Sequence, residues 1–444
     1  MSGIAHVLHD RGHIVSGSDR QESDNTRRLR ALGIQITVGH EASNVNGADV
    51  VVFTPAVPDD NPELVEARQR GIPVMERPEM LGLLMEPCSR RVAVAGTHGK
   101  TTTTSMISVI LVRAGIDATV LIGGDLAAIG GNVRIGDASV IVAEACEAFE
   151  SFLRLRPTIA VITNIDADHL DHYGTVERVE ESFRRFAGNV TADGCVIANA
   201  DDERVRRVLK DCGRRVVWFG LSGSPDLLAG DVDVSSPHAA YTLVEQGHSL
   251  GRVRLGVPGR QNIADSLAAA GAAFELGAEF EDVQEALRRF HGAGRRFEVL
   301  FDDERVLVID DYAHHPAEIR ATLEAARSAY PDRRIIAVFQ PHLYSRTAAL
   351  LDEFADSLLL ADEAIVTSIY AAREAPMEGV NAQAIVTRMK ERGFSDAAYL
   401  ADKSLIPAAL ASRIRDGDLV IVLGAGDIRQ VGEELASMLR ARKA

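Results

Sequence analysis

The residues best suited to chemistry lie in one segment near residue 100. Residues 91–104 read RVAVAGTHGKTTTT: an apolar run, a glycine-containing turn, a Gly-Lys-Thr triplet and a helix-compatible stretch. Glycines let backbone N–H groups point at phosphate oxygens, a lysine reaches the terminal phosphates of a nucleotide, and a threonine hydroxyl can ligate Mg²⁺. Lys100 is the only lysine in the first 209 residues, which favours a specific need for it. We predict a nucleotide site. The alternative is a glycine-rich turn with an incidental lysine, since Val94 replaces the first glycine of the usual phosphate-loop pattern.

Two later segments end in polar residues that could join this site. Residues 139–150 read SVIVAEACEAFE, a strand that ends in Glu144, and residues 163–173 read TNIDADHLDHY, which holds His169. Side chains at the carboxyl end of a parallel sheet lie beside a bound ligand. Taken alone, Glu144 and Glu147 could be solvated loop charges, and His169 a capping or core residue. After a phosphate loop, Glu144 and His169 look like ligands of a second Mg²⁺, although this ion prefers oxygen.

The elements that must position these residues are short apolar strands that alternate with helical stretches. This βα pattern predicts an α/β fold with parallel sheets. We expect domains at residues 1–88, 89–292 and 293–444. A long stretch at 241–257 alternates apolar and polar residues, which predicts one half-exposed antiparallel strand. The other predicted strands are 13–16, 50–53, 92–95, 140–143, 159–163, 195–198, 306–309, 335–339, 364–366 and 419–423.

The composition limits the kinds of partner. The chain has 444 residues and a formal net charge of −16, which argues against nucleic acid as a main partner because phosphate backbones need a basic surface. No apolar run approaches the roughly 18 residues of a membrane span, and no secretory signal is evident, so we expect no membrane insertion and a cytoplasmic location. The scattered cysteines argue against a zinc site or a disulfide framework. They are Cys88, Cys146, Cys195 and Cys212.

The segment GTHGKTTTT at 96–104 resembles the phosphate loop of the Mur ligase family, which also lacks the first glycine. Further similar segments are VPGRQNIADSLAAA at 257–270, GRRF at 294–297, VIDDYAHHP at 308–316 and FQPHLYSRT at 339–347. The resemblance covers nearly the whole chain. It implies a three-domain architecture: a Rossmann-like UDP-binding domain, a central P-loop ATPase-like domain with a parallel sheet, and a Rossmann-like C-terminal domain that binds the amino acid.

The resemblance also implies roles for individual residues. The expected catalytic residues are Lys100, Glu144, His169 and Arg296. The expected ATP-binding residues are Gly96, Thr97, His98, Gly99, Lys100, Thr101, Thr102, Asn262, Arg296, Asp310, Asp311 and His314. Two Mg²⁺ ions would be held by Thr101, Glu144 and His169. The UDP-sugar would be held by Ser18, Asp19, Thr54, Pro55, Ala56, His98, Asn132 and Arg134. The amino acid would be held by His342, Tyr344 and Arg346, whose guanidinium suits a carboxylate.

The activity that the resemblance implies is the ATP-dependent joining of L-alanine to the carboxylate of UDP-N-acetylmuramate, through an acyl phosphate, in peptidoglycan synthesis. Several relatives carry a carbamylated lysine, which the helix ESFRRF at 181–186 lacks; this favours the alanine-adding branch. The alternatives are a ligase that attaches a preformed tripeptide during muropeptide recycling, a folate polyglutamylating ligase, and a non-catalytic nucleotide-binding relative. Neither the choice among alanine, serine and glycine nor the oligomeric state follows from the sequence.

Two departures from the family pattern affect these expectations. The chain begins at Met1 inside the family's N-terminal glycine loop, so we expect either an upstream start or a damaged UDP-binding domain with weak UDP-sugar binding and an unpaired sheet edge. Gln261 and Asp265 replace the histidine and second asparagine of the family's adenine-reading segment, where Asn262 is retained. An aspartate can accept a hydrogen bond from the exocyclic amine of adenine but cannot donate one to adenine N7.

Overall fold

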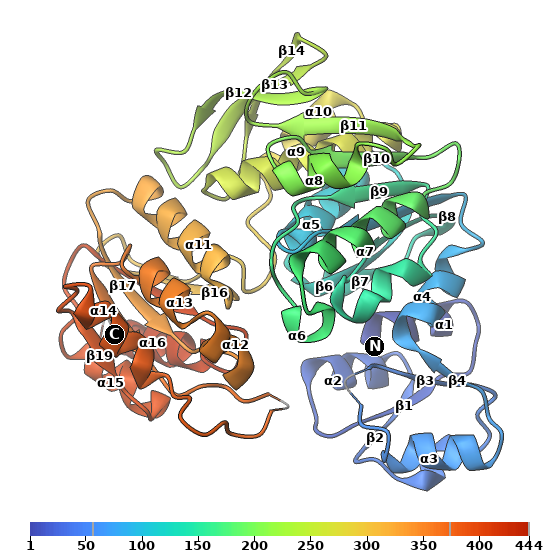
Figure 1. The fold of residues 1–444 in the computed structure, drawn as a ribbon, viewed down its shortest axis with the longest axis horizontal. Coiled ribbons are helices and arrows are strands. Elements are labelled where there is room, and N and C mark those ends of the chain that lie inside the picture. Colours follow the sequence, from blue (N-terminus) through green and yellow to red (C-terminus); the bar gives the residue numbers. More distant parts are fainter. Residues whose placement is uncertain (56, 373, 443–444) are drawn as a thin grey trace. The chain divides into compact units, whose positions relative to one another are not determined.

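A computed structural model describes residues 1–55, 57–372 and 374–442 (Figure 1). The chain divides into two compact units. The first unit comprises residues 1–228, 245–248 and 265–286, and the second comprises residues 229–244, 249–264 and the chain from 287 onward. Both units combine parallel strands with helices, so the α/β prediction is confirmed. Among the described residues, no helix is long and apolar enough to cross a membrane.

The N-terminal part of the first unit contains two separate pairs of parallel strands, β1 with β2 and β3 with β4. The predicted strand at 13–16 is wrong in position, because the strand starts at Ser16; Ile14 is fully exposed and packs against nothing that would hold it extended. The elements are α1 (Ser2–Asp10), β1 (Ser16–Asp19), α2 (Asp24–Ala31), β2 (Gln35–Val38), η1 (Ala42–Val45), β3 (Val51–Phe53), α3 (Pro62–Gln69), β4 (Val74–Glu76) and α4 (Arg77–Met85).

The main sheet of the first unit has the strand order β11-β10-β9-β5-β8-β6-β7, and only β7 runs antiparallel to its neighbour. The middle strand β5 is buried on both faces, as expected for a parallel sheet covered by helices. The strands are β5 (Arg90–Ala95), β6 (Ala118–Leu126), β7 (Gly131–Arg134), β8 (Asp137–Glu144), β9 (Ile159–Ile162), β10 (Cys195–Asn199) and β11 (Arg215–Gly220). The connecting elements are α5 (Lys100–Arg113), η2 (Ala127–Ile129), η3 (Ala148–Arg154), α6 (Leu170–Tyr173), α7 (Val176–Gly188) and α8 (Glu203–Leu209).

The register of this sheet brings the predicted site segments to one edge. Val94 on β5 is opposite Glu144 on β8, and Ala95 is opposite Ile162 on β9. The three strands therefore end side by side. The phosphate-loop segment, the segment after Glu144 and the segment that holds His169 all leave the sheet at this edge.

The predicted single strand at 241–257 is wrong, since the segment forms a hairpin of β13 (Ala240–Glu245) and β14 (His248–Arg254). Gln246 and Gly247 both have positive φ, 47° and 84°, which is the geometry of a two-residue hairpin turn. The alternation of apolar and polar residues continues across this turn, so the sequence pattern alone does not reveal the turn. Before the hairpin lies β12 (Leu227–Asp233), and after it come α9 (Arg260–Glu275) and α10 (Phe280–Arg288).

The second unit is built mainly around a six-stranded sheet, drawn from orange to red in Figure 1. Its strand order is β15-β16-β20-β17-β18-β19. Only β15 is antiparallel, and apolar clusters pack on both faces of the sheet. Its strands are β15 (Glu298–Asp302), β16 (Leu307–Asp311), β17 (Arg334–Phe339), β18 (Glu363–Val366), β19 (Ala397–Tyr399) and β20 (Asp418–Leu423). Its helices are α11 (Pro316–Ala329), α12 (Tyr344–Ala349), α13 (Leu351–Leu358), α14 (Gln383–Glu391), η4 (Lys403–Leu405), α15 (Ile406–Ala411) and α16 (Arg429–Ala441).

Candidate active site

The loop between β5 and α5 needs its two glycines. Gly96 has φ 138° and Gly99 has φ 83°, and L side chains rarely adopt such values. A Cβ atom at Gly96 would overlap the hydroxyl of Thr163, and one at Gly99 would overlap the carboxylate of Asp265. The side chains of Thr163 and Asp265 therefore pack closely against the loop. This packing fixes the direction of its backbone N–H groups, as an anion site requires.

The segment after β9 holds this loop through several hydrogen bonds. The Thr97 N–H donates to the Asn164 carbonyl at 3.1 Å, and the His98 N–H donates to the Asn164 side-chain oxygen at 2.8 Å. The Asp166 N–H donates to the Thr97 hydroxyl at 2.8 Å. Asn164 was not among the predicted site residues, although its polar segment was. Its role depends on strand pairing that a single segment does not reveal.

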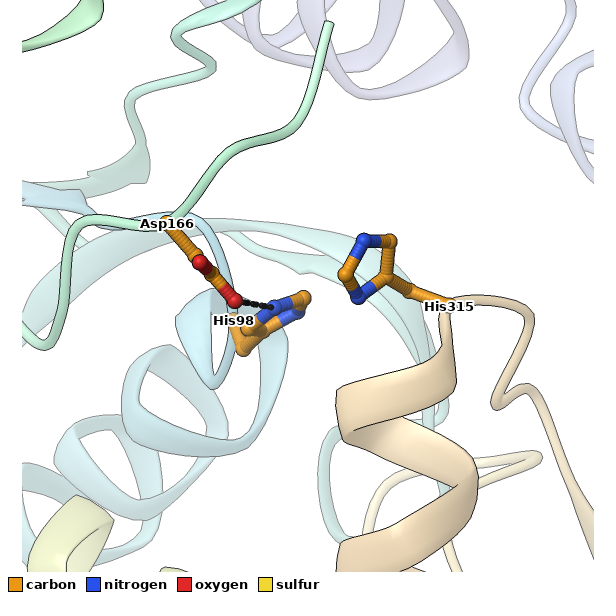
Figure 2. Close-up of side chains that lie close together, drawn as sticks. All are labelled: His98, Asp166 and His315. Atoms are coloured by element: carbon orange, nitrogen blue, oxygen red, sulfur yellow. Dashed lines mark ion pairs between the residues drawn. The ribbon is translucent and has the colours of Figure 1, made fainter. Parts of the chain in front are cut away.

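His98 forms an ion pair with Asp166 if the imidazole is protonated, with Nε2 3.7 Å from Oδ2 (Figure 2). The carboxylate orients the ring of a residue predicted to contact both ATP and the sugar nucleotide. The third side chain in Figure 2, His315, belongs to the second unit and caps α11, where its Nδ1 accepts from the Ala317 N–H at 3.4 Å.

Lys100 opens α5 and lies folded back into the loop. Its Nζ donates to the carbonyl oxygens of Gly96 at 2.5 Å and Thr97 at 3.0 Å, and lies 2.8 Å from the carboxylate of Glu147. Burial is the largest single influence and would lower the pKa of Lys100, but the charge and hydrogen bond of Glu147, together with neighbouring groups that include Glu144, outweigh it, and the pKa is raised. Lys100 is therefore a fixed cation in the phosphate loop. Thr102, on the same helix, is buried.

Thr101 and Glu144 lie together at the edge of the sheet. The Thr101 hydroxyl donates to Oε2 of Glu144 at 3.2 Å, while the Gly123 N–H donates to Oε1 at 2.5 Å. A hydroxyl next to a carboxylate is the oxygen donor set that Mg²⁺ prefers, so these two residues fit the predicted metal. His169 has φ 54° and precedes α6, and its Nε2 lies 3.7 Å from Oε1 of Glu147.

Glu147 is not the solvated loop charge that was one reading of the sequence. It is 2% exposed, and its carbonyl accepts a hydrogen bond from the Tyr173 hydroxyl at 2.5 Å. Burial raises the pKa of Tyr173 to about 12 and that of the Cys146 thiol to about 11, so both groups stay protonated at neutral pH. This buried carboxylate touches two predicted catalytic residues, Lys100 and His169.

The segment at 257–270, which resembles the family's adenine-reading segment, makes two kinds of contact. Asp265 on α9 is buried against Gly99 and accepts from the Thr103 hydroxyl at 3.3 Å, so it supports the phosphate loop. In the second unit, the Asn262 amide donates to the Pro258 carbonyl at 2.6 Å and the Gln261 amide to the Ala321 carbonyl at 3.5 Å.

The residues predicted for the UDP-sugar are spread over the first unit. Ser18 donates to Glu63 at 2.8 Å, and the Asn132 amide donates to Ser2 at 3.1 Å. Arg134 pairs with Asp117 at 2.7 Å, at the amino end of β6 and away from the edge that carries the phosphate loop. Asp19 ends β1, Thr54 and Pro55 follow β3, and Ala56 lies outside the described residues.

In the second unit, the adjacent arginines Arg295 and Arg296 make different contacts. Arg295 donates to the carbonyls of Gly424 and Gly426 and pairs with the buried Asp310 at 3.2 Å. Arg296 lies 3.7 Å from Glu318, and its guanidinium is 5.2 Å from the centre of the Tyr312 ring.

Asp310 and Asp311 both bond to the protein itself. Asp310 is 0% exposed and also pairs with Arg429 at 2.9 Å. Asp311 accepts from the N–H groups of Phe297 and Ala313, each at 2.8 Å. Burial raises the pKa of Asp311 to about 6. Both carboxylates therefore shape the end of β16.

The predicted amino-acid residues gather at the carboxyl end of β17. His342 stacks on Tyr370 with ring centres 5.8 Å apart and lies 5.7 Å from the ring of His314. Burial, together with nearby Arg346, lowers the pKa of His314, whereas Glu318 opposes the shift. Tyr344 and Arg346 lie on α12. The structure thus brings a neutral imidazole and a guanidinium together in this unit.

Comparisons with known proteins agree with this geometry. Family models match residues 1–87 (Mur ligase family, catalytic domain), 94–273 (Mur ligase middle domain) and 295–426 (Mur ligase, glutamate ligase domain). A UDP-N-acetylmuramate–L-alanine ligase of Trichlorobacter lovleyi is 46% identical over 440 residues, covering 99% of this chain and 96% of the relative. The chain belongs to the Mur ligase family. A second such ligase, of Caldanaerobacter subterraneus subsp. tengcongensis, is 46% identical over 435 residues, with 98% of this chain and 94% of the relative covered.

Solved structures of the family share the whole fold. The crystal structure of a UDP-N-acetylmuramate–alanine ligase from Thermotoga maritima has a TM-score of 0.85 and 31% identity, with 100% of this chain and 97% of that chain covered. A murein peptide ligase from Psychrobacter arcticus has a TM-score of 0.70 and 25% identity, with 99% and 96% covered. The predicted three-domain Mur ligase architecture is confirmed.

The close packing behind the family's phosphate loop gives a stability prediction. Gly99→Ala should lower the free energy of unfolding more than Gly115→Ala does. Both glycines have positive φ, so each change costs about 1 kcal/mol, but only Gly99 meets a neighbouring group, which adds about 1–3 kcal/mol. Denaturant unfolding of the two variants measures the difference, and equal losses would show that Asp265 does not press on the loop.

The buried charge network of the second unit gives a second stability prediction. Asp310→Asn should reduce the free energy of unfolding by about 3–5 kcal/mol, because Arg295 and Arg429 lose their shared buried carboxylate. Asp416→Asn is the control, since the exposed Asp416 pairs with Arg305 at 3.7 Å and should contribute about 0–1 kcal/mol. Urea titrations of both variants test the contrast. A loss for Asp310→Asn no larger than for the control contradicts it.

Proposed function

We propose that this chain is an ATP-dependent ligase that joins L-alanine to the carboxylate of UDP-N-acetylmuramate. The observation that carries the proposal is the 46% identity, over 99% of the chain, to a relative named for that reaction. The phosphate loop at Gly96, Gly99 and Lys100 supports the use of ATP. The proposed reaction supplies a precursor of peptidoglycan and takes place in the cytoplasm, where ATP is available.

The reaction would proceed in two steps. The muramyl carboxylate attacks the γ-phosphorus of ATP, the bond to the β-phosphate oxygen breaks, and ADP leaves. The amine of L-alanine then attacks the carbonyl carbon of the acyl phosphate. The tetrahedral intermediate loses phosphate and a proton, which leaves an amide. Activation is needed because a free carboxylate has no leaving group that an amine could displace.

The loop residues would act on the first step. Backbone N–H groups of residues 96–101 and the Lys100 ammonium would bind the phosphates and offset the negative charge on the transferring group. Thr101 and Glu144, with His169 as the third predicted ligand, would hold Mg²⁺. When bound, Mg²⁺ supplies further positive charge to the phosphate oxygens.

The other predicted site residues would bind the substrates. His342, Tyr344 and Arg346 would hold alanine, with the Arg346 fork on its carboxylate and the amine left free. We also keep the domain limits 1–88, 89–292 and 293–444. The roles of Arg296, Asn262, Asp310, Asp311 and His314 toward ATP, and of Ser18, Asp19, Thr54, Pro55, Ala56, His98, Asn132 and Arg134 toward the UDP-sugar, rest on the sequence resemblance.

Isotope transfer tests the proposed chemistry. UDP-N-acetylmuramate labelled with ¹⁸O in its carboxylate is incubated with ATP, Mg²⁺ and L-alanine. We expect one ¹⁸O atom in the released phosphate and a product with the mass of the alanyl conjugate. Phosphate without ¹⁸O would exclude the acyl phosphate, and the absence of an alanyl product would exclude the ligase function.

A further inference from the structure

Glu147 is a buried carboxylate with a fixed position. It follows β8 by three residues, and its side chain is 3% exposed. The Tyr173 hydroxyl holds its carbonyl, and Tyr173 in turn lies 3.4 Å from the Ser182 hydroxyl on α7. These contacts anchor the residue from two elements other than its own. The carboxylate is therefore held against the phosphate loop by the surrounding protein.

Glu147 occupies one of the positions that Lys100 would offer to a phosphate. An ammonium group has three protons, and three acceptors surround the Lys100 Nζ: the carbonyls of Gly96 and Thr97 and the carboxylate of Glu147. The two carbonyls belong to the loop itself. Glu147 is the charged acceptor and comes from a different segment. A phosphate oxygen that binds Lys100 must displace one of the three.

We propose that Glu147 is a positioning residue that holds Lys100 inside the loop and is displaced from it when a nucleoside triphosphate binds. The proposal rests on the proposed use of ATP. Displacement leaves a buried carboxylate without its lysine cation, which is costly. The His169 ring, 3.7 Å away, carries a charge that could offset this only when it is protonated. The affinity for the triphosphate is therefore lower than the loop would give without Glu147.

The test is ATP binding in the presence of EDTA, measured by calorimetry. Metal-free conditions are chosen so that any contact of Glu147 with a metal ion does not affect the result. Glu147→Gln removes the charge at nearly constant shape, and we expect its Kd for ATP to fall at least about tenfold below that of the wild-type protein, since a charge-assisted hydrogen bond no longer competes. A merely structural role would weaken binding instead.

Three further variants make the test decisive. Glu147→Ala also removes the charge and serves if the glutamine variant unfolds, whereas Glu147→Asp retains the charge and should bind ATP as weakly as wild type. Glu150→Gln is the matched control: Glu150 pairs with Arg185 at 3.0 Å on the surface, so its loss should leave the Kd unchanged. If the folded Glu147→Gln and Glu147→Ala variants bind ATP no more tightly than wild type, the proposal for Glu147 is wrong, while the proposed function is unaffected. A wild-type protein that binds no ATP with or without Mg²⁺ would overturn the proposed function as well.

Discussion

Replacing Lys100 by alanine is expected to lower kcat/KM for ATP-dependent phosphate release by at least about 10²–10³-fold, the usual cost of losing one preorganised charge donor. Lys100 supplies the cation that the loop holds in place through Gly96, Thr97 and Glu147. Its removal takes positive charge away from the transferring phosphoryl group and leaves the buried Glu147 without its lysine partner. Steady-state phosphate release at saturating sugar nucleotide and amino acid measures the loss.

Lys210→Ala provides the control for this experiment. Lys210 is the next lysine in the chain and is exposed at the end of α8. We expect wild-type rates from this variant. A Lys100→Ala protein that retains more than about a tenth of the wild-type kcat/KM would show that Lys100 is structural and that the phosphates are bound by another part of the chain.

Replacing Glu144 by glutamine is expected to reduce phosphate release by about 10²-fold at low Mg²⁺ and to raise the Mg²⁺ concentration needed for half-maximal rate. Glutamine keeps the shape and the hydrogen bond from the Gly123 N–H, but it removes the negative charge beside the Thr101 hydroxyl. Mg²⁺ binds charged oxygen ligands much more tightly than neutral ones. A titration of rate against Mg²⁺ separates lost metal affinity from lost catalysis.

The matched control for Glu144→Gln is Asp137→Asn at the other end of β8. Asp137 is exposed, and its carboxylate accepts only a local hydrogen bond from the Ser139 N–H among the contacts described. Its Mg²⁺ dependence should equal that of wild type. If Glu144→Gln shows the same Mg²⁺ dependence as this control, the metal is held elsewhere.

Much of the central site could be predicted because its signals are local. The strand, the glycine turn, Lys100 and Thr101 follow one another within a few residues, and parallel pairing then places Glu144 at the same edge. Burial of Glu147 could not be predicted, since it depends on Tyr173, 26 residues away, and on the helix that presents it. The position of Asn164 against the loop has the same origin, because the two strands that carry them must first pair.

The end of β16 shows that the contacts of polar residues after a strand do not follow from the sequence. The sequence resemblance predicts that Asp310, Asp311 and His314 bind ATP. In the fold, Asp310 is tied to Arg295 and Arg429, the latter 119 residues away, and Asp311 accepts from two backbone N–H groups. Sequence shows that such carboxylates are present. Only tertiary structure shows that they are already hydrogen-bonded.

The most direct test of the proposed function is phosphate release from ATP, Mg²⁺ and UDP-N-acetylmuramate with three acceptor conditions: L-alanine, a tripeptide and no acceptor. We expect sustained release with L-alanine, little without an acceptor, and little with the tripeptide. Release that requires the tripeptide, or no release under any condition by a protein that is folded, would contradict the assignment of this chain as an L-alanine-adding ligase.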